Sequence, residues 1–219
     1  MTNLLTHISL AYKLAALQLM LSEANHFSEK LRLATPHPIQ ATNLVAANVS
    51  PPALGFGGTI QTTNYAFSFG ASGKLCFLSQ FIVGLPDTTE AIQQRRRELA
   101  KKPSLLDTNG AWQLATQWLH ALDADMPALS RLPHTVEQEH FLDPLTPSAG
   151  RQPVPIFNVY WGEEMDSPLN IRLHGLTKLP LAIRFENCAL LRRPALVVSN
   201  AADLNAQPNS DSRPLLKRP

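Results

Sequence analysis

Residues 65–69, Tyr65-Ala-Phe-Ser-Phe69, alternate large aromatic side chains with small ones. Successive side chains of a β-strand point to opposite faces of a sheet. Tyr65, Phe67 and Phe69 therefore share one face of a strand, and Ala66 and Ser68 share the other. The alternation is typical of a strand with one buried face, and we predict a strand over residues 59–69.

A turn and a second strand follow this segment. Gly70 and Gly73 favour a tight turn, because glycine adopts backbone angles that other residues avoid. The next strand is again predicted from alternation, with Leu75, Phe77 and Phe81 on one face and Cys76, Leu78 and Gln80 on the other. Together the two strands predict an antiparallel hairpin.

The second half of the chain has the same kind of pattern. Residues 169–173 and 179–185 alternate apolar and polar side chains, and Gly175-Leu-Thr-Lys178 joins them as a turn. We predict a second hairpin there, with Leu181, Ile183 and Phe185 on its buried face. Further strands are predicted over three segments, which are 43–49, 134–142 and 154–161.

Three segments are predicted to be helical. In the longest, 9–33, apolar residues recur every three or four positions, giving the stripe Leu10, Leu14, Leu17, Leu21, Ala24, Phe27 and Leu31. Residues 88–102 predict a polar helix that carries Arg95, Arg96, Arg97, Lys101 and Lys102. Residues 111–123 predict a helix that buries Trp112 and Trp118, and two tryptophans place this helix near the centre of the core.

The order of these elements predicts an α+β fold made of two units, each with a helix packed on an antiparallel sheet in the order α-β-β-β. The first unit spans residues 1–87 and the second spans 107–204. Residues 88–106 form a basic helical connector between them. Residues 205–219 are rich in proline and polar residues, which predicts a disordered tail.

The repeated order resembles tandem PepSY-like and cystatin-like modules. The residues that carry the resemblance are Tyr65, Phe67, Gly70, Gly73, Lys74 and Leu75 in the first half and Ala111, Ala115, Trp118, Phe157, Val159 and Gly175 in the second. The chain departs from the PepSY pattern where Gly175-Leu-Thr-Lys178 replaces the usual Asp-x-x-Thr-Gly turn. The resemblance implies a non-enzymatic module of the bacterial cell envelope or exterior that binds or inhibits another molecule.

Overall composition argues against two classes of partner. The 219 residues carry 19 basic and 17 acidic side chains, and the net charge of +2 gives no field that would attract nucleic acid. The basic residues between positions 95 and 102 are expected to form the solvated face of the connector, so we expect no nucleic-acid partner. No stretch approaches the ~20 apolar residues that span a bilayer, and we expect no membrane span.

Two cysteines, Cys76 and Cys188, leave the cellular compartment open. Buried free thiols within strands are one interpretation. A disulfide between them is the alternative, and it needs an oxidising compartment. The N-terminus lacks a cationic start and a cleavage site, so the chain as written is expected in the cytoplasm, and in the periplasm or exterior if a signal peptide lies upstream of Met1.

His134, Glu137, Glu139 and His140 form the densest group of histidine and glutamate in the sequence. A small hydrolase that uses these residues is the alternative to a binding module. A metal site is not expected, since His134 and His140 on one strand would lie about 20 Å apart. The sequence has no cofactor motif, and we expect no cofactor.

A second candidate site is the loop that contains Gly55, Phe56, Gly57 and Gly58. It lacks the ending of a phosphate-binding loop and precedes a strand, so we interpret it as a loop that needs positive φ angles. The leading hypothesis is a non-catalytic binding or interaction module for an unknown protein or small ligand. Its contact surface is expected to be this loop or the exposed face of one sheet.

Overall fold

The structure is a computed structural model that describes residues 9–50, 57–70, 73–80, 88–163, 167–186 and 188–192. Over these residues the chain is α+β, with four α-helices and a single antiparallel sheet of eight strands. The helices are α1 (Leu10–Leu31), α2 (Thr89–Ala100), α3 (Thr108–Ala121) and α4 (Met126–Leu129). The strands are β1 (Ala46–Val49), β2 (Gly58–Gln61), β3 (Tyr65–Phe69), β4 (Leu75–Gln80), β5 (His134–Leu142), β6 (Arg151–Trp161), β7 (Leu169–His174) and β8 (Pro180–Phe185). The predicted tail, 205–219, lies outside the described residues.

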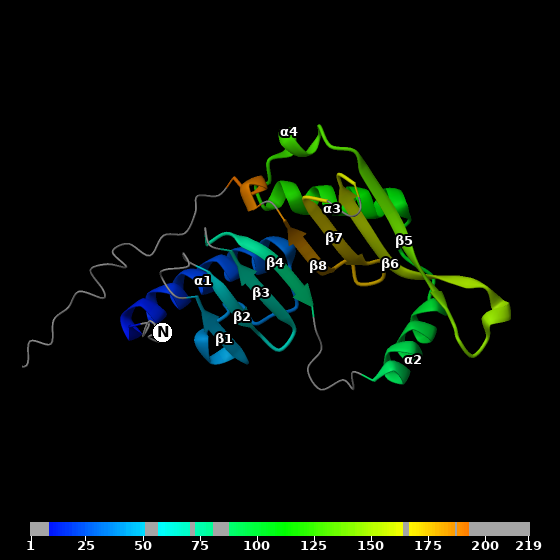
Figure 1. Ribbon diagram of the computed structural model, residues 1–219, viewed down its shortest axis with the longest axis horizontal. Coiled ribbons are helices and arrows are strands. Elements are labelled where there is room, and N and C mark those ends of the chain that lie inside the picture. The colour runs from blue at the N-terminus through cyan, green and yellow to red at the C-terminus, as the bar shows by residue number, and fades with distance from the viewer. Residues whose placement is uncertain are drawn as a thin grey trace, which may run out of the picture.

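The sheet joins two sets of four strands edge to edge (Figure 1). Its order is β1-β2-β3-β4-β8-β7-β6-β5, so each set follows the chain order and the last strands of the two sets meet. Strands β4 and β8 pair antiparallel, with Leu78 opposite Ile183. The predicted α+β class with an antiparallel sheet is therefore confirmed.

Paired residues in neighbouring strands form rows that cross all eight strands. The middle row, which we call the apolar strip, is Ala47, Ile60, Phe67, Leu78, Ile183, Ile171, Val159 and Val136. Residues directly opposite each other in antiparallel strands lie on the same face of the sheet. The strip is consequently one continuous hydrophobic surface, and most of it belongs to the main core.

Helices α1 and α3 cover the face of the sheet that carries the apolar strip (Figure 1). Helix α2 packs on the opposite face, where Leu99 and Ala100 contact a second cluster formed by Phe141, Val154 and Ile156. Among the described residues, no helix has the length and apolar composition that crossing a membrane requires. Of the helices in the described ranges, none covers the remainder of the face on which α2 packs.

Side-chain caps fix where the three long helices begin. The Ser9 hydroxyl accepts a hydrogen bond from the Tyr12 amide before α1, and the Thr88 hydroxyl accepts one from the Ala91 amide before α2. The Asp107 carboxylate accepts a hydrogen bond of 2.7 Å from the amide of Gly110 at the start of α3. Such caps satisfy amides that have no partner within the first helical turn.

The buried stripe of α1 differs from the predicted one in its N-terminal half. Its apolar members are Tyr12, Ala16, Met20, Ala24, Phe27 and Leu31. Leu10 and Leu14, which belong to the predicted stripe, are 72% and 52% exposed. Successive members of the predicted stripe are 3.5 residues apart on average, whereas an α-helix has 3.6 residues per turn. The stripe therefore winds slowly around the helix, and its N-terminal members point away from the core.

Strand β4 also differs from its predicted alternation, and the difference exposes Phe77. The pairing of β3 with β4 shifts register between Ser68 and Phe69, which places Phe69 opposite Leu75 and Ser68 opposite Phe77. An extra residue in one strand changes which face its side chains occupy. Leu75 and Leu78 are buried whereas Phe77 is 37% exposed, so the prediction that Leu75 and Phe77 share a face was wrong.

Two further strand predictions were wrong. Residues 59–69 form two strands rather than one, because the Thr62 hydroxyl accepts a hydrogen bond of 3.1 Å from the Tyr65 amide and holds a turn between them. Leu181 does not share the buried face of Ile183. A register shift beside Leu173 turns Leu181 toward the second cluster, near α2.

Candidate interaction surface

The sheet face that points away from α1 and α3 carries two rows of mostly polar or small residues, one on each side of the apolar strip. The Phe77 row is Asn48, Thr59, Ser68, Phe77, Arg184, Asn170, Tyr160 and Thr135. The Arg172 row is Ala46, Gln61, Ala66, Ser79, Ala182, Arg172, Asn158 and Glu137. We call the two rows together the open face.

Side chains of the open face are more accessible to solvent than those of the apolar strip. On β3, Phe67 is fully buried, whereas Ala66 and Ser68 on either side of it are partly exposed. On β7, Ile171 is fully buried and Arg172 retains 38% of its side-chain exposure. The alternation predicted for both strands is present, and it gives the sheet one covered face and one accessible face.

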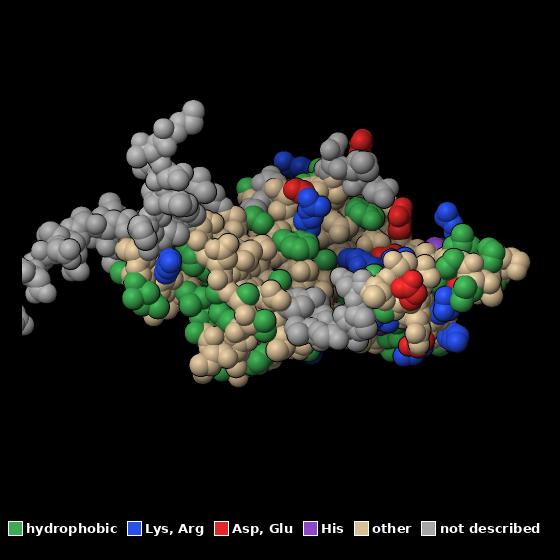
Figure 2. All heavy atoms as spheres, turned by 60° about the horizontal axis from the view of Figure 1, so that its bottom comes forward, with side chains coloured by type: hydrophobic (Ala, Val, Ile, Leu, Met, Phe, Trp, Pro, Cys, Tyr) green, Lys and Arg blue, Asp and Glu red, His purple; other side chains and the backbone are tan. Residues whose placement is uncertain are grey.

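Charge is distributed unevenly along the open face. The sequence from Leu33 to Gly73, which provides β1, β2 and β3, contains no Asp, Glu, Lys or Arg. Figure 2 shows few charged side chains over this part of the molecule, whereas Lys, Arg, Asp and Glu gather at the end that carries α2. One half of the open face is therefore neutral and rich in hydroxyl and amide groups, and the other half is charged.

The charged half is organised around Glu139 of β5. Arg172 donates two hydrogen bonds to the Glu139 carboxylate, from Nε to Oε1 at 2.6 Å and from a terminal nitrogen to Oε2 at 3.1 Å. Asn158 donates a third at 3.2 Å, and Arg96 of α2 lies 4.0 Å from Oε2. A two-point guanidinium–carboxylate pair has a defined geometry, so this network fixes the relative positions of β5, β6 and β7.

The network also determines the charge state of Glu139. Burial of the carboxyl group acts to raise its pKa, because desolvation penalises the charged form. The hydrogen bond and positive charge of Arg172, together with Asn158 and Arg96, outweigh burial and hold the pKa below its ordinary value. Glu139 is consequently ionised at neutral pH and is engaged with its partners rather than free to act as a base.

Helix α2 borders the charged half of the open face. Arg97 lies 2.8 Å from the Asp143 carboxylate, which links the helix to the residue after β5.

His174, at the end of β7, accepts hydrogen bonds at Nδ1 from the amides of Leu176 and Thr177, at 3.2 and 3.4 Å. Burial, and then the positive charge of Lys102, lower the pKa of His174 below its ordinary value of 6.5.

The structure does not bring the four residues of the hydrolase hypothesis together. His134 stacks on Trp112 of α3, with 3.8 Å between the ring centroids, on the helix-covered side of the sheet. Glu137 and Glu139 belong to the other side, and His140 pairs with Pro153 beyond a register shift. Within the described residues, no three His, Cys, Asp or Glu side chains are placed to hold a metal ion.

The glycine-rich loop is described only in part. Gly55 and Phe56 lie outside the described residues. A side chain at Gly57 would lie 3.0 Å from the carbonyl oxygens of Phe69 and Gly70, and Gly58 has φ of +151° and abuts the Asn48 carbonyl. Close backbone packing therefore requires glycine at both positions, and the positive φ angle that we expected is present at Gly58.

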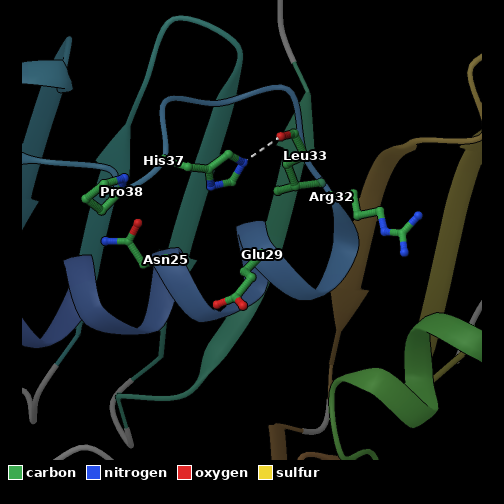
Figure 3. A pocket seen from close by; sticks show the side chains of 6 residues that line it. All are labelled: Asn25, Glu29, Arg32, Leu33, His37 and Pro38. Carbon is green, nitrogen blue, oxygen red and sulfur yellow. Dashed lines mark hydrogen bonds between the residues drawn. The ribbon is translucent and has the colours of Figure 1, made fainter.

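A pocket of about 590 Å³ lies beside the C-terminal end of α1, between Asn25, Glu29 and His37 (Figure 3). Its polar groups hold the chain after the helix. His37 hydrogen-bonds the Leu33 carbonyl through Nε2 at 3.1 Å, and Asn25 hydrogen-bonds both the amide and the carbonyl of Ile39. These hydrogen bonds give Asn25 and His37 a structural role in holding the chain after α1.

Two components of the open face escaped prediction from the sequence. The exposure of Phe77 was missed because the alternation places it on the same face as Leu75, and the shift in β4 has no sequence signature. The pair between Glu139 and Arg172 joins residues on different strands, and each strand showed only its own alternation.

No protein-family model matches the chain, and no curated protein and no solved structure matches it.

Proposed function

We propose that the chain is a non-catalytic binding module and that the open face is its contact surface. Two in-register rows of side chains cross all eight strands, one on each side of an apolar strip that is mostly buried, and this observation supports the proposal. An exposed aromatic side chain, Phe77, lies in the middle of one row. Exposed aromatic and arginine side chains are enriched where proteins bind one another.

The width of the open face favours a protein partner over a small ligand. Eight strands spaced about 4.8 Å apart span about 34 Å between the outermost strands. A standard protein interface buries about 800 Å² on each partner, so a protein partner would contact strands of both sets. Small molecules bind in concave pockets instead, and the open face is an extended sheet surface.

We further infer that the two halves are helix-plus-sheet units of the kind that PepSY-like and cystatin-like modules contain. In support, each half has a long helix followed by four strands that are neighbours in the sheet, α1 with β1 to β4 and α3 with β5 to β8. Joining the last strands of two such units closes one edge of each. The open face is then a surface to which both units contribute.

An oxidising compartment is part of the proposal. Cys76 is disulfide-bonded, and Cys188 is the one other cysteine of the chain. Lys74 donates a hydrogen bond of 2.7 Å to the Leu191 carbonyl, which brings the segment after Cys188 close to the start of β4. Disulfides persist mainly in secreted and periplasmic proteins, so the envelope or exterior of a bacterial cell suits the chain.

Photo-crosslinking in the cells that produce the protein tests the proposal. A benzophenone amino acid replaces Phe77 in one variant and Ala66, also on the open face, in another. Gln113, exposed on α3, provides the matched control on the helix-covered side. We expect a discrete crosslinked protein from positions 77 and 66 and none from 113. Crosslinking from 113 with none from 77 and 66 would exclude the open face.

A further inference from the structure

A groove of about 490 Å³ lies where the end of α1, the middle of α3 and the β7–β8 turn meet. Its apolar wall includes Leu31, Leu114, Trp118 and Leu179. Trp118 is 6% exposed, so its ring contributes to the groove while remaining anchored in the core. The volume is in the range of pockets that hold small organic molecules.

Three cations surround this apolar wall. Lys30 and Arg32 come from the end of α1, and Lys178 comes from the β7–β8 turn. The residues that line the groove include no Asp or Glu, and none of the three cations forms an ion pair within the described part of the chain. Figure 3 shows the Arg32 side chain extending away from Glu29 and His37.

The backbone holds two of these cations in an uncommon conformation. Arg32 has φ of 52° and Lys178 has φ of 55°, in the left-handed region that favours glycine or asparagine. Each closes a local turn, since the Arg32 amide bonds the Glu29 carbonyl and the Lys178 amide bonds the His174 carbonyl. Glycine or asparagine would close either turn with less strain, so the turns alone do not account for a cation at both positions.

We propose that the groove binds a small organic anion with an aliphatic or aromatic body. The cations neutralise the acidic group, and the apolar wall removes the body from water. Either a carboxylate or a phosphate group can accept hydrogen bonds from the three cations, because Lys and Arg side chains donate hydrogen bonds and accept none. Bound there, the anion bridges residues of the first helix and residues of the second half of the chain. This site is separate from the open face and does not depend on the function proposed for it.

Titration with octanoate tests the proposal. Binding is measured by calorimetry and by intrinsic tryptophan fluorescence, to which Trp118 contributes together with Trp112 and Trp161. Octyl phosphate, octanol and octylammonium are compared under the same conditions. We expect saturable binding of the two anions, weakened by added salt, and at least tenfold weaker binding of octanol and octylammonium. A carboxylate ligand and a phosphate ligand are distinguished by which of the two anions binds more tightly.

Variants separate charge from folding. The double variant Arg32→Asn/Lys178→Asn removes two cations and keeps residues that tolerate positive φ, so its thermal melt should match that of the wild type. We expect it to bind octanoate at least tenfold more weakly, whereas Arg32→Lys/Lys178→Arg keeps binding. Lys101→Gln, in a cation outside the groove, should change nothing. Equal binding of octanol and octanoate, no saturable binding, or full binding by the Asn variant would overturn the proposal.

Discussion

Phe77 of β4 lies directly opposite Arg184 of β8, at the one pairing that joins the two sets of four strands among the described residues. An exposed aromatic ring is thus the cross-strand neighbour of an arginine whose side chain is 62% exposed. On one side of this pair the sheet surface is neutral, and on the other side it carries the Glu139–Arg172 network. The middle of the open face combines both kinds of surface.

Glu139→Gln should destabilise the fold. The substitution leaves Arg172 without its anionic partner, and losing a partly buried, charge-assisted hydrogen bond costs about 1.5–3 kcal/mol. Urea unfolding measures the loss. Glu137→Gln, on the same strand but exposed, is the matched control and should change stability by less than about 0.5 kcal/mol. Equal losses of stability in the two variants would show that the Glu139 network does not stabilise the fold.

His174 should make the fold less stable as the pH falls. Because the folded pKa of His174 lies below 6.5, the unfolded chain binds a proton more readily than the folded chain. The stability that neutral His174 contributes to the fold is complete when the pH lies above its ordinary pKa of 6.5. This stability decreases as the pH falls through 6.5 toward the lowered pKa of the folded state. His174→Asn keeps an acceptor for the Leu176 amide and removes the titration.

Urea unfolding at a series of pH values checks the role of His174. The difference in stability between wild type and His174→Asn should depend on pH below about 6.5 and become constant above it. The exposed His140, replaced in His140→Asn, serves as the control. A pH dependence that survives unchanged in His174→Asn would assign the effect to other groups.

Trp118→Ala should cost about 3–5 kcal/mol, because the substitution removes a large ring that is 6% exposed and packs in the main core. Thermal and urea unfolding measure the cost. Gln117→Ala, the preceding and exposed residue on α3, should unfold almost as the wild type does. An unchanged melt for Trp118→Ala would mean that this ring does not support the core.

The purified chain should contain no reactive thiol before reduction. Cys76 is disulfide-bonded and the sequence has one other cysteine, so the unfolded, unreduced monomer should react with no thiol reagent and the reduced chain should react twice. Mass spectrometry of the unreduced digest is expected to find a peptide pair that links residues 76 and 188. Two free thiols in freshly purified, unreduced protein would remove the argument for an oxidising compartment.

Local patterns were sufficient to predict most elements of the fold. The alternation of Tyr65, Phe67 and Phe69 and the periodicity of residues 9–33 each describe an element that exists. Side-chain placement failed where it depends on a neighbouring strand or helix. The register shift that exposes Phe77 exists only where β4 pairs with β3. Helix α1 contains two apolar stripes, and the elements that pack against the helix determine which stripe is buried.

The candidate site was predictable only as a type of surface. The exposed face of a sheet follows from alternation, but its extent depends on the pairing of β4 with β8, which neither half of the sequence specifies. Likewise, Glu139 and Arg172 are separated by 33 residues, and the order of β5, β6 and β7 brings them together. Long-range pairing of this kind is set by packing and not by local preference.

Nuclear Overhauser effects between backbone protons of β4 and β8 test the central claim most directly, because every row of the open face crosses this pairing. We expect interstrand contacts that place Leu78 opposite Ile183 and Phe77 opposite Arg184. We also expect slow hydrogen exchange for the amides that bond across the two strands. Absent contacts, with β4 and β8 exchanging as fast as the edge strands β1 and β5, would contradict it.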